Sequence, residues 1–287
     1  MLGHAMSHLR REICPGRYRT PRSTRTWFRS ATAAIAAAVF LLCTCGCANY
    51  PDSVDRAGLP RSDRAALAVL NFRNTTEKEQ AARFQPWEYG IATMLSTDLE
   101  ALGVFNIVER ERLRDIVHEH KLQVSDLVDS QTAVKLGRLV AANYLLTGSF
   151  SEMKGELRIA VQVFSVEKGV QLGAASIQGE TDTFFTMEKK LFIKVIDFLE
   201  VMMNEEDLVR IEGAVETRSV DASLMNYSGE MALARARELK RTGRNQDAVR
   251  LLQEARKKFS EALAYDPAYA RARKNLETLA MAIPITL

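Results

Sequence analysis

The chain has 287 residues, of which 47% are hydrophobic and 26% are charged. This length suits one large domain or two ordinary ones, and the composition excludes a disordered or a fibrous protein. The net charge is uneven: residues 1–46 carry +6, residues 47–221 carry −8 and residues 222–287 carry +5. The body that follows the basic N-terminus therefore lacks the strongly basic character of a nucleic-acid-binding protein.

The cysteines are confined to the N-terminus. All four, Cys14, Cys43, Cys45 and Cys47, lie in the first 47 residues. The rest of the chain therefore has no disulfide framework, no Cys-ligated zinc or iron–sulfur site and no cysteine nucleophile. A body without cysteine also suits an oxidising compartment.

Residues 1–46 have the pattern of a secretory signal peptide. Seven arginines precede an apolar run at residues 34–42, and small residues follow that run. A membrane-spanning helix is the alternative. The run from Ala31 to Ala48 has at most 18 residues, however, and a span needs about 20 apolar residues. We therefore predict an export signal.

The segment Thr44-Cys45-Gly46-Cys47 resembles the lipidation box of bacterial lipoproteins, in which a small residue precedes the modified cysteine. Gly46 fits that position better than Thr44, so we predict lipidation at Cys47, with Cys45 as the second choice. Several acyl chains, at about 0.8 kcal/mol per buried CH₂, make a durable anchor. Lipoproteins of this kind that stay at the inner membrane carry Asp after the cysteine. Ala48 here favours the periplasmic face of the outer membrane.

After a polar tether at residues 47–64, the pattern alternates between apolar runs and helical spacing. The pairs Lys154-Gly155 and Lys168-Gly169 mark turns between three successive strands. This predicts an α/β domain at residues 65–203, with flanking helices and an antiparallel meander in a mixed sheet. In chain order, we predict a strand at 65–72, a loop at 73–85, a helix from Pro86 to a stop at Gly103, a strand at 105–108, helices at 112–122 and 131–140, strands at 142–150, 157–166 and 170–181, and a helix at 184–203.

Residues 204–221 are charged and are predicted to be a linker. Residues 222–287 have only helical periodicity, which predicts a small all-α region. The segment Ala262–Pro267 resembles the end of a tetratricopeptide repeat, so we predict a helical hairpin plus a closing helix. This region either binds a partner or docks on the α/β domain. Its basic residues at 235–258 could meet an acidic surface, and the −8 region is the nearest one.

Three segments of the α/β domain together resemble the curli-secretion (CsgG-like) lipoprotein family. They are Leu67–Phe72, Phe105–Arg110 and Leu136–Ser149. Similar domains occur in activators of penicillin-binding proteins and at the N-terminus of TolB-like proteins. The resemblance implies a periplasmic α/β domain tethered to the outer membrane. The secretion pore of that family uses two long hairpins, whereas Ser151–Glu156 and Gly179–Thr183 are too short to cross a bilayer.

The sequence offers little catalytic chemistry. His118 and His120 are separated by one residue, which places them on different sides of a helix and excludes a shared metal ion. No nucleophile elbow, phosphate loop or zinc-protease motif is present. We therefore predict a protein that is not an enzyme and that uses no cofactor or metal. The candidate partner contacts are Trp87, Tyr89, Arg110, Tyr265 and Tyr269. For Trp87 and Tyr89 the pattern favours burial over an exposed contact patch, and for Arg110 it favours a structural role near the sheet edge.

These features predict an outer-membrane-anchored lipoprotein that acts as a non-catalytic scaffold or assembly factor in cell-envelope biogenesis or curli-type secretion. The expected partners are the outer membrane, through the lipid anchor, and envelope or secretion-complex proteins. Assembly into a homo-oligomer stays open. One alternative is a component of an oligomeric curli-like secretion channel. A second alternative is an activator of a peptidoglycan synthase.

Overall fold

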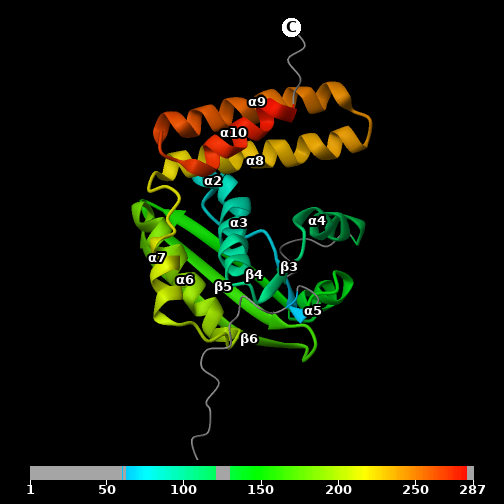
Figure 1. Cartoon of the computed structure of the whole chain (residues 1–287), viewed down its shortest axis with the longest axis vertical. Helices are drawn as coiled ribbons and strands as arrows, with labels where there is room; N and C mark the ends of the chain where they lie inside the picture. The colour runs from blue at the N-terminus through cyan, green and yellow to red at the C-terminus, as the bar shows by residue number, and fades with distance from the viewer. Residues whose placement is uncertain (1–59, 61–62, 121–129, 283–287) are drawn as a thin grey trace, which may run out of the picture. The chain divides into compact units, whose positions relative to one another are not determined.

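The structure is a computed structural model that describes residue 60 and residues 63–120 and 130–282. The signal peptide expected at residues 1–46 and most of the tether expected at residues 47–64 lie outside these ranges. The described part from residue 63 onward belongs to one compact unit. It contains a mixed sheet, helices on both faces of that sheet, and a separate layer of helices (Figure 1).

The sheet has the order β3-β1-β4-β5-β6, with the short strand β2 pairing with β4 beyond the end of β1. Strands β3, β1 and β4 are parallel, whereas β4, β5 and β6 form an antiparallel meander. The predicted fold class, a mixed α/β sheet followed by an all-helical region, is therefore confirmed. The strands are β1 (Ala65–Val69), β2 (Arg73–Asn74), β3 (Phe105–Ile107), β4 (Tyr144–Met153), β5 (Glu156–Ser165) and β6 (Val170–Glu180).

The turns of the meander follow from local chemistry. Lys154 and Gly155 have φ values of 55° and 87°, and Gly169 has a φ of 69°. Lys154 and Gly155 form a two-residue hairpin turn, in which positive φ at both positions matches the twist of the two strands. The longer connection at residues 166–169 has its positive φ at Gly169 only. Both turns were predicted at these positions, and the first joins β4 directly to β5.

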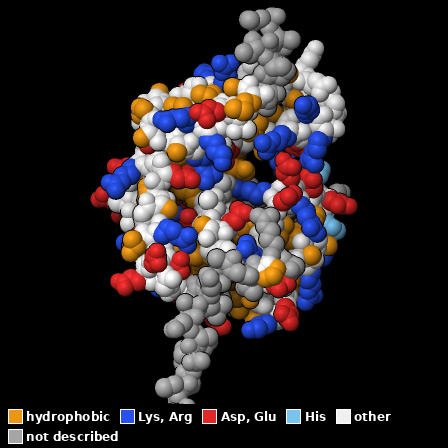
Figure 2. Space-filling model, in the orientation of Figure 1, with side chains coloured by type: hydrophobic (Ala, Val, Ile, Leu, Met, Phe, Trp, Pro, Cys, Tyr) orange, Lys and Arg blue, Asp and Glu red, His pale blue; other side chains and the backbone are white. Residues whose placement is uncertain are grey.

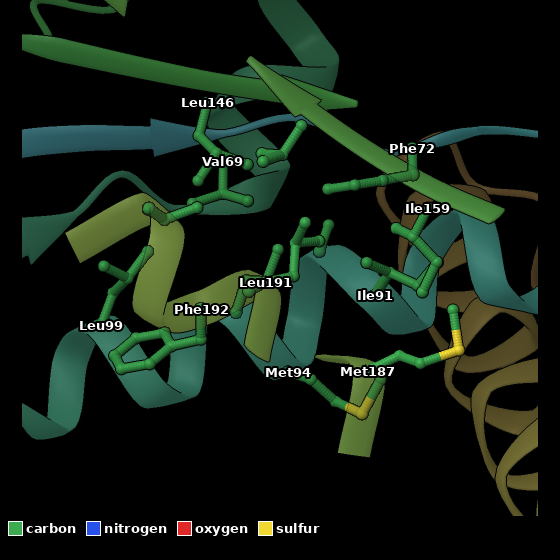
Figure 3. Packing of buried hydrophobic residues seen from close by; sticks show 14 of the residues in the cluster. Val69, Phe72, Ile91, Met94, Leu99, Leu146, Ile159, Met187, Leu191 and Phe192 are labelled. Atoms are coloured by element: carbon green, nitrogen blue, oxygen red, sulfur yellow. The ribbon is translucent and has the colours of Figure 1, made fainter. Parts of the chain in front are cut away.

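Helices cover the sheet on both faces. α3 and α6 pack on one face through a large apolar core that includes Val69, Leu146 and Ile159 (Figure 3). α4 and α5 pack on the other face, against residues such as Leu145 and Phe164. The helices are α2 (Lys78–Phe84), α3 (Pro86–Ala101), α4 (Arg110–Glu119), α5 (Ser130–Leu139), α6 (Phe184–Phe198), α7 (Glu205–Gly213), α8 (Val220–Arg241), α9 (Asn245–Tyr265) and α10 (Ala270–Ala282), with the 3₁₀ turn η4 at Thr181–Thr183.

Two polar segments contain more regular structure than the sequence pattern predicts. Residues 73–85, expected to be a loop, contain β2 and α2. Residues 204–221, expected to be a linker, contain α7, whose Asn204 side chain accepts a hydrogen bond from the Asp207 amide. Both helices are short and mostly polar, so their apolar periodicity is too weak to detect.

The helices α8, α9 and α10 form a layer that packs on the outer side of α3 (Figure 1). Trp87 of α3 is fully buried and donates a hydrogen bond from Nε1 to Oγ of Ser223 in α8, at 3.1 Å. The backbones approach closely at Gly90, where a Cβ atom would lie 2.5 Å from the Tyr227 ring. The α3 helix is therefore buried between the sheet and α8.

Among the described residues, none of the helices combines the length and the apolar character needed to cross a membrane.

We expect Gly90→Ala to weaken the contact between α3 and α8. The added methyl group overlaps the buried Tyr227 ring, and overpacking of this kind destabilises a protein by about 1–3 kcal/mol. That loss exceeds the gain of about 1 kcal/mol in helix propensity when Ala replaces Gly. Urea denaturation followed by circular dichroism measures the change. Gly213→Ala is the matched control, because a Cβ atom there meets no other atom within 4 Å. If Gly90→Ala and Gly213→Ala unfold at the same urea concentration, close packing of α3 on α8 at Gly90 does not limit stability.

Candidate functional site

A cleft of about 860 Å³ lies between α4 and α8, and we call it the α4–α8 cleft. Its lining comes from residues 69–71 after β1, residues 88–89 of α3, residues 109–117 around α4 and residues 231–238 of α8. Figure 2 shows a hollow between the helical layer and the α/β part, bordered by basic and acidic side chains. Its volume is in the range of ligand-binding clefts in proteins.

The topology of the sheet explains the position of the cleft. The chain leaves β1, crosses to β3 on one side through α3, and later returns to β4 on the other side. The carboxyl ends of the parallel strands β1 and β3 lie at the same edge of the sheet, and α3 and α4 leave this edge on opposite faces. Open α/β sheets bind ligands outside the carboxyl ends of their strands.

Arg110, the first residue of α4, connects the elements at the floor of the cleft. Its Nη1 donates to the Tyr89 carbonyl oxygen at 3.0 Å and to Oγ1 of Thr93, and its Nη2 donates to Oδ1 of Asn71. The guanidinium carbon lies 3.8 Å from the centroid of the Tyr89 ring. Burial lowers the pKa of Arg110, but arginine remains charged. The residue thus joins the end of β1, α3 and α4 through neutral acceptors.

Arg114 follows Arg110 by one helical turn and also lines the cleft. Its Nη2 atom is buried and has no hydrogen-bond partner within the part of the chain that the structure describes. The apolar part of the wall includes Leu113 and Val117 of α4 and Met231 of α8. The interior of the cleft is therefore both apolar and cationic.

Acidic and basic residues pair where α4 and α8 face each other at the rim. Arg241 of α8 lies 3.3 Å from Asp115 of α4, and Arg237 lies 4.0 Å from Glu111. All four side chains are about half exposed, so solvent screens both pairs and they contribute little to stability. These contacts show that part of the basic helical layer meets the acidic α/β part of the same chain.

Residues 48–166 match the family model described as "Curli production assembly/transport component CsgG". The resemblance to the CsgG-like family is confirmed. The matched segment runs from before β1 to the residue after β5, so it includes the floor of the α4–α8 cleft but not α8. We refer to residues 48–166 as the CsgG-like region. No curated protein matches the chain.

The chain has limited similarity to several solved structures. The C-terminal domain of LpoB from Salmonella enterica is 20% identical, with a TM-score of 0.31, and the alignment covers 43% of this chain and 87% of that domain. TolB from Acinetobacter baumannii is 12% identical, with a TM-score of 0.33 and coverages of 50% and 30%. The PelC dodecamer from Paraburkholderia phytofirmans is 16% identical, with a TM-score of 0.29 and coverages of 49% and 89%.

The structure separates the five candidate contact residues. Tyr89 and Arg110 lie together in the α4–α8 cleft, within the CsgG-like region. Tyr265, at the end of α9, is 58% exposed and lies away from the cleft. Trp87 and Tyr269 are 0% and 1% exposed, because α8 and the start of α10 pack over them. A partner cannot reach these two side chains in this structure.

The predicted lipidation site lies outside the described residues. Cys47 and the second choice, Cys45, both precede residue 60, where the described part begins. Lipidation at Cys47 therefore stays a prediction.

A buried ionic cluster lies between α3 and α6, and the sequence pattern did not predict it. Lys189 Nζ lies 2.6 Å from Oδ2 of Asp98 and 3.3 Å from Oε2 of Glu188, and all three residues are less than 9% exposed. Burial, followed by the nearby Asp98 carboxylate, raises the pKa of Glu188 from its ordinary value of 4.5 to about 8. The sequence feature that could have indicated this cluster is the presence of charged residues within the apolar stripes of two predicted helices.

The ionic cluster borders a small cavity of about 20 Å³ beneath the helical layer. Tyr227, Tyr269 and Arg271 line its other side, and the guanidinium of Arg271 contacts the Glu216 carboxylate at 2.5 and 2.8 Å. This volume is sufficient for about one water molecule. The cluster therefore belongs to the interface that holds the helical layer on the α/β part.

We expect the stability of the chain to fall between about pH 5 and pH 8 because of Glu188. In this range the folded chain retains a proton on Glu188 that the unfolded chain has released. The free energy of unfolding therefore decreases as the pH rises, until the pH passes the folded-state pKa of about 8. Gln at position 188 stays neutral and removes this loss. Relative to wild type, E188Q should gain more than about 1 kcal/mol at pH 8.5 compared with pH 5.5.

Urea denaturation at the two pH values measures this difference. E206Q on the exposed face of α7 is the control, and it should follow the wild-type pH dependence. If E188Q and wild type change in parallel between pH 5.5 and pH 8.5, Glu188 does not hold its proton in the folded chain.

Proposed function

We propose that this chain is an outer-membrane-anchored periplasmic lipoprotein that acts as a non-catalytic scaffold in the assembly of an envelope complex. The match of residues 48–166 to the CsgG family carries this proposal. The basic, apolar N-terminus that ends in Cys47 supports export and lipidation. Localisation, anchoring and the absence of catalysis are all parts of the proposal.

The architecture supports a binding role. The helical layer is held on α3 by the buried Trp87–Ser223 hydrogen bond, and Arg110 holds the start of α4 on α3 through the Tyr89 carbonyl oxygen. Both walls of the α4–α8 cleft are therefore attached to the same helix, as expected of a preformed binding surface. The polar groups at its floor are engaged in holding elements together rather than arranged as a nucleophile with a base.

A second candidate function is a component of a transport complex. The function of the matched family, described as a curli production assembly/transport component, favours it. In that case the chain would be one subunit of a larger ring of identical chains, whereas a scaffold could act as a monomer or dimer.

We expect lipid attachment to depend on Cys47. Metabolic labelling with a radioactive fatty acid should mark the wild-type chain and the Cys45→Ser variant, and the label should be lost in the Cys47→Ser variant. The labelled chain should sediment with outer-membrane vesicles. Label that is retained in Cys47→Ser but lost in Cys45→Ser would assign lipidation to Cys45 instead. Absence of label from all three forms would refute the proposal that the chain is a lipid-anchored protein.

The mass of the detergent-extracted chain separates the two candidate functions. Light scattering should give a monomer or dimer if the chain is a scaffold. A discrete larger ring, together with conductance in planar bilayers, would favour the transport-complex component instead. The Cys47→Ser variant, purified without detergent, is the control for association caused by the lipid chains alone.

A further inference from the structure

Two guanidinium groups lie on the same face of α4, at the inner wall of the α4–α8 cleft. Arg114 follows Arg110 at the i, i+4 spacing, at which like charges destabilise a helix. Burial is the largest influence on Arg110 and lowers its pKa, the nearby Tyr89 and Glu230 raise it, and the charge of Arg114 lowers it by a smaller amount. Two positive charges therefore lie next to each other on the α4 wall, and this arrangement is unfavourable without a nearby negative charge.

The hydrogen bonds of Arg110 do not compensate this charge. Its acceptors are the Tyr89 carbonyl, the Thr93 hydroxyl and the Asn71 amide oxygen, all of which are neutral. Arg114 has a buried Nη2 atom without a hydrogen-bond partner among the described residues. A buried donor of this kind is unfavourable unless an acceptor reaches it.

Three of the four acidic residues that line the cleft have partners of their own. Glu111 faces Arg237 at 4.0 Å, and Glu238 contacts Arg235 at 2.8 Å. Glu88 accepts a hydrogen bond from the Asn74 amide, and burial raises the pKa of its carboxyl group. The fourth, Glu109, precedes α4 and is exposed. None of these carboxylates reaches the Nη2 atom of Arg114, so that donor is left for the carboxylate of an incoming segment.

The rest of the wall is apolar. Leu70 after β1, Leu113 and Val117 of α4, and Met231 and Ala234 of α8 all line the cleft. Leu70 and Leu113 are already buried in the core of the α/β part, whereas Val117, Met231 and Ala234 are partly exposed. A small inorganic anion would leave these three side chains uncovered. An occupant that matches the whole cleft needs an anionic group for Arg114 and apolar groups on both sides of it. A groove between two helices is also a recurring site for a peptide with apolar anchors.

We propose that the α4–α8 cleft binds a polypeptide segment of a partner protein in which a carboxylate side chain lies between apolar side chains. The carboxylate pairs with Arg114, and the apolar side chains cover Val117, Met231 and Ala234. Arg110 positions the start of α4 and does not need to touch the segment. This inference rests on the proposed scaffold function and specifies the chemistry of the partner.

The experiment uses a displayed library of random twelve-residue peptides, selected against the full-length chain. Enriched peptides should carry Asp or Glu between apolar residues. One enriched peptide, labelled with fluorescein, is then measured by fluorescence anisotropy against wild type, Arg114→Gln and Arg256→Gln. Arg114→Gln should weaken binding at least about tenfold, because it removes a charge-assisted hydrogen bond. Arg256→Gln removes an exposed charge of α9 that does not line the cleft, so it should change the affinity less than about threefold.

A second variant keeps the test valid if Arg114→Gln does not fold. Ala234→Glu places a carboxylate on the α8 wall, where it competes with the peptide for Arg114. This variant should also lose binding, and its helix propensity remains favourable. Circular dichroism spectra and unfolding curves verify that each variant is folded before binding is compared.

Several outcomes would overturn the proposal. They are enriched peptides without acidic residues, equal affinities of wild type and Arg114→Gln, and no enriched peptide whose binding depends on the cleft. Displacement of the peptide by inorganic phosphate, with no loss of affinity when its apolar residues become serine, would indicate a simple anion site instead.

Lipid labelling and mass do not depend on the cleft, so failure of the peptide-binding test would leave the proposed scaffold function standing. A chain that binds the peptide but carries no lipid would fail only the proposed function.

Discussion

The burial of α3 on two opposite sides is the constraint on which the rest of the molecule depends. One side of this helix packs on the sheet through residues such as Ile91 and Leu95, and the other side meets α8. A helix that is apolar around most of its circumference cannot face water, so it requires a second covering layer. Gly90 allows that layer to approach closely, because any side chain there would overlap the Tyr227 ring. The helical layer therefore completes the core of the α/β part.

The cleft is a consequence of this arrangement. Once α8 is fixed on α3, its C-terminal half extends beyond α3 and faces α4 across the carboxyl edge of the sheet. Arg110 holds the near end of α4 to β1 and α3, and Arg241 reaches Asp115 from the opposite wall. The two walls come from parts of the chain with opposite net charge, and only the exposed rim uses that complementarity. The interior retains the positive charge of Arg114.

The sequence predicts those elements whose causes are local. The meander is predicted correctly because Gly155 and Gly169 permit the turn geometry and because β5 alternates between apolar and polar residues. Helices α2 and α7 are missed, since a short polar helix has no apolar stripe. The site is harder to predict because its geometry depends on distant contacts. Burial of Trp87 is decided by α8, which is 136 residues away at Ser223, and the pair of Asp98 and Lys189 is separated by 91 residues. Arg110 is the exception, because it belongs to a segment that resembles a known family.

The position of β1 has a mechanical consequence. β1 is the first strand of the described chain, yet it lies inside the sheet, with parallel partners β3 and β4 on its two sides. A force applied to the N-terminal side of the chain therefore pulls along the axis of a strand that is hydrogen-bonded on both edges. Such a load acts on all of these hydrogen bonds in shear at the same time, rather than opening them one after another. An edge strand in this place would peel away under much smaller tension, so the arrangement suits a body that is held by its N-terminus.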